Sequence, residues 1–225
     1  MKVNIIEFVG RAGVGKTYIA KNLYNDFENN DLKNIYLSTF DRRKISLKPS
    51  IDTLIILIKA IYIAFKLKPN SIGDFLGLFR RTYTILRRYK YYNKYIKKHK
   101  SSDINLNIFE DEGISQKCRT LNNKSKLLFE DIFKIMFNEI KLDNFEKDKI
   151  NYYYVFVTAK SELIHERIYD RDKTRTIVTN ESIIKGKEEI KQFSSNYDFV
   201  RFVLIDNNSS SIVKVLNELK SKILN

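Results

Sequence analysis

The chain has 225 residues, of which 43% are hydrophobic and 30% are charged, a composition typical of a globular protein rather than a disordered one. Its single cysteine, Cys118, excludes a disulfide framework and a multi-cysteine zinc site. The 41 Lys and Arg residues outnumber the 27 Asp and Glu residues and give a net charge of +14. We therefore expect an anionic partner, and nucleotide, phosphosugar, nucleic acid and acidic lipid all fit.

Apolar segments alternate with helix-like segments along the chain. The expected strands are residues 3–9, 35–39, 104–109, 152–158 and 199–205. A helix is expected over 15–27, and another over 212–224 at the end of the chain. This alternation predicts a three-layer α/β domain over 1–225, with a five-stranded, mostly parallel sheet and helices on both faces.

About 60 residues between the second and third strands contain no convincing strand and suit two helices. Residues 51–67 are mostly apolar. The second helix is indicated by apolar residues spaced four and three apart, namely Ile72, Leu76, Phe79, Tyr83 and Leu86. We therefore interpret 44–103 as a helical, basic insertion that covers the acceptor side of the sheet.

Residues 10–17, GRAGVGKT, match the phosphate-binding pattern GxxxxGK[ST] in full, directly after an apolar strand and directly before a helix. Glycines let such a loop bend tightly, and the following helix adds partial positive charge for phosphate oxygens. The nucleotide-binding residues predicted from this motif are Gly10, Gly13, Val14, Gly15, Lys16, Thr17 and Tyr18. Lys16 would bridge the β- and γ-phosphates and the Thr17 hydroxyl would bind Mg²⁺, so ATP and Mg²⁺ are the expected cofactors.

Three carboxylates, Glu110, Asp111 and Glu112, stand at the carboxyl end of the third predicted strand, before Gly113. Ligands of open α/β sheets bind at that edge, and a phosphate-binding loop needs an acid there for Mg²⁺. Asp111 is the predicted metal ligand. Glu112 would hold the metal or orient a nucleophile. The alternative interpretation is a solvated acidic turn.

An arginine-rich segment follows the fourth predicted strand. Arg167, Arg171 and Arg175 are four residues apart, which places them within about 80° of arc on a helix. Aligned guanidinium groups suit a γ-phosphoryl group in transfer, because the transition state spreads charge over its oxygens. We interpret 160–180 as an arginine-rich lid, although Asp170 and Asp172 would equally make it a salt-bridged surface helix.

The glycine-rich loop, the acid after the third strand and the R-x-x-x-R-D-K-x-R segment together resemble the nucleoside and nucleoside-monophosphate kinases, with thymidylate-kinase-like proteins nearest. The resemblance covers 1–41 and 104–225. It implies a P-loop kinase fold, with substrate contacts after the second strand at Asp41, Arg42 and Arg43. It also implies that the loop containing Asn207 packs on adenine. The family motif after the third strand is commonly Asp-Arg, where this chain has Asp111 and Glu112.

The expected activity is transfer of the γ-phosphoryl group of Mg-ATP to a nucleoside, nucleotide or sugar-type acceptor. Asp41 would accept the proton of a substrate hydroxyl, which suits an alcohol. Arg42 and Arg43 would hold a phosphate or carboxylate, which suits an acceptor that is already phosphorylated. Asp41 as a helix cap or an ion-pair partner of Arg43 is the alternative. The residues leave these choices open.

The segment 80–100 holds nine Lys or Arg residues, no acid and five tyrosines. It would track nucleic acid, settle on an acidic membrane surface beside the apolar residues 54–65, or form a solvated amphipathic helix. A P-loop ATP-binding protein acting on nucleic acid, or on a membrane- or envelope-linked acceptor, is therefore the alternative function. A homodimer also stays open. Without a signal peptide or an apolar run of about 20 residues, the expected location is cytoplasmic, with peripheral membrane attachment left open.

Overall fold

The structure is a computed structural model. It describes residues 2–28, 33–37, 51–99, 106–111, 113, 124–127, 131–132, 135, 150–173, 179–195, 200–208 and 211–224. The chain divides into two compact units. One unit comprises Met1–Thr39, Ile104–Gly113 and Glu146–Asn225, and the other comprises Phe40–Asp103 and Ile114–Phe145.

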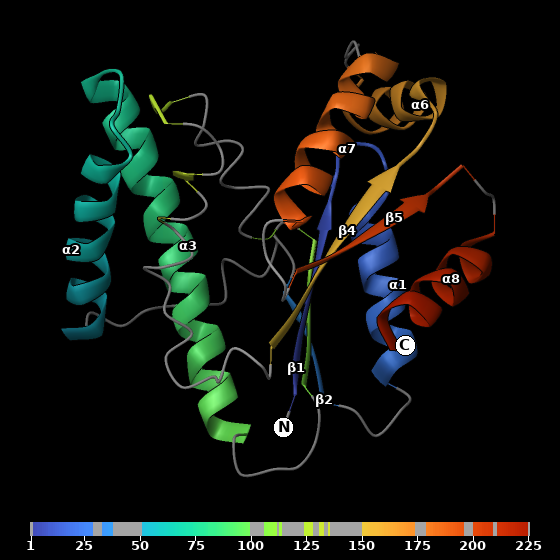
Figure 1. The fold of residues 1–225 in the computed structure, drawn as a ribbon, viewed down its shortest axis with the longest axis horizontal. Coiled ribbons are helices and arrows are strands. Elements are labelled where there is room, and N and C mark those ends of the chain that lie inside the picture. Colours follow the sequence, from blue (N-terminus) through green and yellow to red (C-terminus); the bar gives the residue numbers. More distant parts are fainter. Residues whose placement is uncertain are drawn as a thin grey trace. The chain divides into compact units, whose positions relative to one another are not determined.

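The first unit is built on a five-stranded, wholly parallel sheet (Figure 1). Its strands are β1 (Val3–Val9), β2 (Lys33–Leu37), β3 (Leu106–Glu110), β4 (Ile150–Thr158) and β5 (Val200–Asp206). Their spatial order is β2-β3-β1-β4-β5, which confirms the predicted α/β fold with a five-stranded parallel sheet. The strands are rich in apolar and aromatic residues because helices cover both faces of such a sheet.

Helices α1 (Lys16–Glu28) and α8 (Ile212–Leu224) cover one face of the sheet, and their apolar residues form one core with those of the strands. Phe27 of α1 packs edge-on against Phe109 of β3, with ring centroids 5.6 Å apart. Helix α6 (Ser161–Asp172) adds Ile164 and Ile168 to this core. Helix α7 (Asn180–Ser195) packs against β4 and β5 and lies on the other side of the sheet from α8 (Figure 1).

A ladder of asparagine side chains joins four neighbouring strands. Asn107 of β3 is central: its amide donates to Asn34 of β2 at 3.0 Å, and its oxygen accepts from Asn4 of β1 at 2.8 Å. Asn151 of β4 donates to Asn4 at 3.0 Å. Asn34 also donates to the carbonyl oxygen of Phe27 at 2.8 Å, near the end of α1. All four residues lie in one row of the strand register, so the ladder specifies that register.

The second unit contains the helices α2 (Ile51–Lys66) and α3 (Ile72–His99), which pack against each other as a hairpin. They lie between β2 and β3 in the chain, which confirms the predicted pair of helices. Helix α3 extends beyond the apolar repeat that predicted it, and the first two residues of that repeat, Ile72 and Leu76, are exposed. No helix in the described part of the chain is long and apolar enough to cross a membrane.

The start of α3 is fixed by polar contacts. The Ser71 hydroxyl accepts a hydrogen bond from the backbone N–H of Asp74 at 3.1 Å, in the manner of a helix N-cap. The Asp74 carboxylate in turn accepts from Lys124 at 3.1 Å. The hydrogen bond from Lys124, followed by that from Ser71, holds the pKa of Asp74 below its usual value.

The ladder yields a test of what fixes the sheet. Replacing Asn107 by Ala removes two of its hydrogen bonds and leaves amide groups of Asn4 and Asn34 without this buried partner. The free energy of unfolding should therefore fall by about 1–3 kcal/mol. Urea denaturation measures this as a lower midpoint with an unchanged slope. Asn151→Ala, at the end of the ladder, is the control and should lower the free energy of unfolding by less. An equal loss of stability in the two variants would contradict the central role of Asn107.

Candidate functional site

The candidate site lies where the parallel strands end. Strand β1 runs into the glycine-rich loop 10–15, β3 into Asp111, and β5 into Asn207. Because the strands are parallel, their carboxyl ends meet at one edge of the sheet, which is where α/β proteins bind ligands. The fold thus brings segments from distant parts of the sequence to one place.

The loop 10–15 depends on its glycines, as Gly13 and Gly15 show. Gly13 has φ +82°, and a Cβ atom built on it would lie 2.9 Å from Ile168 Cγ1 and 3.1 Å from the Ile164 carbonyl oxygen. Gly15 has φ +91°, and its Cβ would meet the side-chain amide of Asn207. Positive φ is strained for other residues, and neither position has space for a side chain. The loop is therefore packed closely against α6 and against the segment that follows β5.

Lys16 is the first residue of α1, directly after this loop. Its ammonium group donates hydrogen bonds to the carbonyl oxygens of Gly10 at 2.8 Å and Arg11 at 2.7 Å. The positive charge is therefore held at the loop, beside the N-terminus of α1, which carries a partial positive charge of its own. Of the other predicted loop residues, Val14 is buried and Tyr18 is mostly exposed.

Thr17 and Asp111 come together at the end of β3. The Thr17 hydroxyl donates to Asp111 Oδ2 at 3.2 Å, and the Tyr36 hydroxyl lies 3.5 Å from the same carboxylate oxygen. Asp111 is fully buried although it carries a carboxylate. A hydroxyl and a carboxylate are oxygen ligands of the kind Mg²⁺ prefers, and Mg²⁺ usually takes only one or two protein carboxylates beside water and phosphate oxygens. The two residues therefore fit a magnesium ion.

The described residues contain no group of three or more His, Cys, Asp or Glu side chains that could hold a metal ion. A site with one carboxylate and one hydroxyl does not need such a group, because phosphate oxygens complete the coordination of Mg²⁺.

Arg167 and Asn207 connect the loop to two other segments. Asn207 donates its side-chain amide to the Val14 carbonyl oxygen at 2.8 Å and its backbone N–H to the Thr158 carbonyl oxygen at 2.8 Å. The Arg167 guanidinium lies 3.5 Å from the Gly13 carbonyl oxygen and 3.4 Å from that of Asn207. Arg167 thus lies beside the loop, and Asn207 has a direct structural role that the sequence did not indicate.

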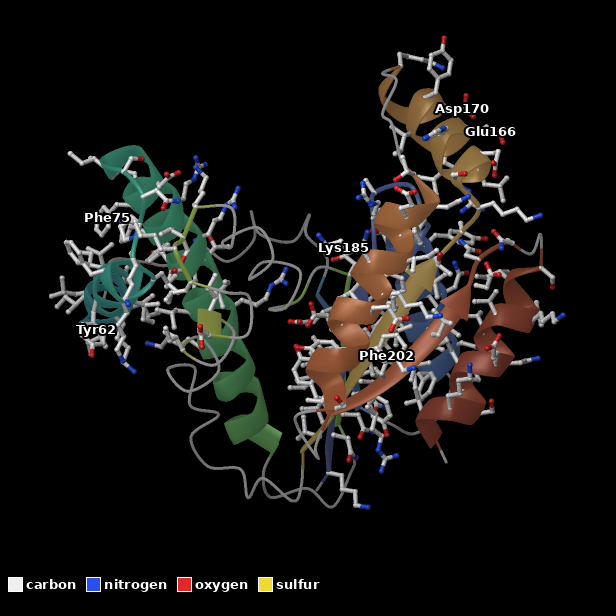
Figure 2. The ribbon with its side chains drawn as sticks, turned by 45° about the horizontal axis from the view of Figure 1, so that its top comes forward. Tyr62, Phe75, Glu166, Asp170, Lys185 and Phe202 are labelled. Atoms are coloured by element: carbon white, nitrogen blue, oxygen red, sulfur yellow. The ribbon has the colours of Figure 1, made fainter. Side chains whose placement is uncertain are left out.

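The other predicted site residues are less fully described. Arg171 lies on α6 one turn after Arg167, where Glu166 and Asp170 are exposed (Figure 2). The predicted lid 160–180 comprises α6 and the start of α7, apart from residues 174–178. Five predicted residues lie outside the described ones, namely Asp41, Arg42, Arg43, Glu112 and Arg175.

A buried polar cluster lies beside Asp111, and sequence reasoning did not identify which residues meet in it. Glu7 of β1 and Glu110 of β3 lie opposite each other in the register and are both fully buried. The Tyr152 hydroxyl donates to Glu7 Oε2 at 2.8 Å. A Cβ atom on Gly113 would overlap both carboxylate side chains. Glu110 and Gly113 are therefore closely packed against Glu7. The signal in the sequence was a charged residue, Glu7, within an apolar strand.

Comparison with known proteins leaves the family open. No protein-family model matches the sequence, and no curated protein matches it. Among solved structures, an uncharacterized protein from Eubacterium ventriosum shares 12% identity over 99% of this chain and 97% of its own, with a TM-score of 0.40. APE1195 shares 14% identity over 99% of this chain and 94% of its own, with a TM-score of 0.44. The parallel α/β, P-loop-like fold therefore rests on the strand order and the loop described above.

The contact from Asn207 to the loop can be tested directly. Asn207→Ala removes the hydrogen bond to Val14 and leaves a buried carbonyl oxygen without it. The free energy of unfolding should fall by about 1–3 kcal/mol, and the amides of residues 10–15 should exchange faster with deuterated solvent. Asn208→Ala is the matched control, because this exposed neighbour accepts instead from the backbone N–H of Lys160. Unchanged exchange in the loop of Asn207→Ala would refute the role of Asn207.

Proposed function

We propose that this chain is a kinase that transfers the γ-phosphoryl group of Mg-ATP to a small-molecule acceptor. The observation that carries the proposal is the pairing of Thr17 with Asp111 at 3.2 Å, directly beside the loop that holds Lys16. A loop for phosphates and an oxygen pair for a hard cation are what phosphoryl transfer from Mg-ATP requires at one place.

We assign each residue a role that its position supports. Lys16 binds the β- and γ-phosphates and offsets their negative charge. Thr17 and Asp111 hold Mg²⁺, which when bound neutralises charge on the phosphate oxygens. Arg167 has more N–H donors than its two long contacts use, so it can also stabilise the group in transfer. Catalysis then consists of positioning and electrostatic stabilisation.

The acceptor is proposed only as a class. Asp41 would activate an alcohol, and Arg42 and Arg43 would hold an acceptor that already carries phosphate. ADP release, measured with pooled nucleosides, nucleoside monophosphates, sugars and sugar phosphates, distinguishes these two classes. Stimulation by a phosphorylated pool favours an acceptor held by Arg42 and Arg43. Stimulation by an unphosphorylated pool favours an alcohol activated by Asp41.

Lys16→Ala should abolish this ADP release while the protein stays folded, because Lys16 contacts the loop and phosphate rather than the core. Lys21→Ala is the matched control, since Lys21 is an exposed lysine on the same helix. Thermal unfolding checks that both variants keep their fold. Full activity of Lys16→Ala, in any pool that stimulates the wild type, would refute the proposal.

Asp111→Asn keeps the size of the side chain and removes its charge. The concentration of Mg²⁺ needed for half-maximal ADP release should rise by about tenfold or more, because the cation loses the carboxylate of Asp111. A titration of activity with Mg²⁺ at saturating ATP measures this shift. An unchanged requirement in a folded variant would remove Asp111 from the metal site and contradict the observation on which the proposal rests.

The charge of the second unit favours one other candidate, a P-loop protein that acts on nucleic acid. Residues 51–100 contain twelve Lys or Arg and two Asp, which gives +10 of the total of +14. In that case no small molecule would stimulate ADP release, and DNA or RNA would do so with a steep dependence on salt.

A further inference from the structure

Helix α2 is apolar on two sides. On one side Ile56, Ala60 and Ile63 are buried in the hairpin with α3. The other side, which we call the outer face of α2, is exposed and consists of Leu54, Ile55, Ile58, Ile61, Tyr62 and Phe65. These residues recur at intervals of three and four, so they form one continuous stripe along the helix. A stripe of this length costs free energy in water and suggests an apolar contact.

The exposed surface continues past the end of α2. Phe65 packs against Phe75 of α3 with ring centroids 4.6 Å apart, which joins the two helices at their turn. Ile72 and Leu76, in the first turns of α3, are also exposed, at 83% and 59%. Figure 2 shows the side chains of Tyr62 and Phe75 on this hairpin. Both helices of the hairpin therefore carry exposed apolar residues.

Basic residues border this surface. Lys59 and Lys66 are exposed and lie two helical turns apart, so they stand along the same side of α2. The Lys66 ammonium lies 4.9 Å from the centre of the Tyr62 ring. Lysine side chains in such positions lay their methylene stems on apolar surface and extend their charge outward. The two acids in residues 51–100, Asp52 and Asp74, do little to offset twelve basic residues.

We propose that the α2–α3 hairpin binds the surface of an anionic phospholipid bilayer, with the outer face of α2 inserted at the level of the headgroups. An apolar stripe bordered by lysines matches both parts of that surface, since acyl chains take up the apolar side chains and lipid phosphates face the lysines. This binding is additional to the proposed kinase activity and does not depend on it.

Two other occupants match the surface less well. A second copy of the chain would meet this face symmetrically and bring the same lysine-bearing surfaces together, so like charges would oppose the contact. Nucleic acid would pair with the lysines but would leave the outer face of α2 without an apolar phase. Charge complementarity excludes the second copy and the apolar stripe excludes nucleic acid, so the lipid surface matches best.

The test is sedimentation of the full chain with vesicles of phosphatidylcholine, alone or with about 30% phosphatidylglycerol as the anionic lipid. We expect wild-type protein to sediment with the anionic vesicles and to bind neutral ones far less. Ile58→Glu and Phe65→Glu should each lower the partition coefficient by about tenfold or more, because a buried apolar contact with lipid is lost. Lys66→Gln should lower it by about fivefold.

Ile184→Glu is the matched control. Ile184 of α7 and Ile58 of α2 are the same residue type on a helix, both are 58% exposed, and both substitutions add one negative charge. If only net charge matters, the two variants should lose vesicle binding equally. If α2 inserts into the bilayer, only Ile58→Glu should lose vesicle binding. Since both positions are exposed, thermal unfolding should be unchanged in both variants.

Three results would overturn the proposal. One is wild-type protein that stays in the supernatant with anionic vesicles. Another is equal binding by Ile58→Glu and Ile184→Glu, which would show attraction by net charge alone. The third is a wild-type dimer that Ile58→Glu converts to a monomer in the absence of vesicle binding, which would make a second copy the occupant of the face.

Discussion

The asparagine ladder and the parallel strand register are the constraint on which the rest of the first unit depends. In a sheet buried on both faces, apolar side chains tolerate a shift along the strand better than paired amides do, because amides lose their hydrogen bonds at once. Asn107 binds Asn4 on one side and Asn34 on the other. With β1 and β3 held in this register, Thr17 and Asp111 meet at the opposite end of the same strands.

The glycine-rich loop is held from several directions rather than by its own sequence alone. Gly13 packs on Ile164 and Ile168 of α6, and Asn207 binds the loop through Val14. A loop fixed in this way keeps its backbone arranged before a ligand arrives, which lowers the entropy cost of binding. This arrangement requires glycine at positions 13 and 15, because any larger residue there would displace α6 or Asn207.

The two units divide the chemistry of the chain. The first carries the loop, the oxygen pair of Thr17 and Asp111, and the arginine beside them. The second carries most of the net positive charge and the outer face of α2. The proposed phosphoryl transfer and the proposed attachment to a lipid surface thus depend on different residues. An acceptor that resides at a membrane would give both proposals one biological setting.

Much of the site was readable from the sequence because it depends on local order. The pattern of residues 10–17 between a strand and a helix identified Lys16 and Thr17, and an acid after an apolar strand identified Asp111. The alternation of segments predicted the parallel sheet, with the strands within about two residues of their observed bounds. The two helices of the insertion were also predicted from local features, the first from its apolar composition and the second from its apolar spacing.

The sequence by itself therefore determined the type and order of the elements and pointed to the residues of the candidate site, because these follow from local pattern. Only the tertiary structure decided which distant residues meet. It paired Glu7 with Tyr152, placed Asn207 on the loop, and aligned four asparagines in one row. It also showed which of the two apolar sides of α2 is exposed. The sequence does not show this, because both sides of the helix are apolar. Such contacts depend on the strand order and packing, which no local pattern encodes.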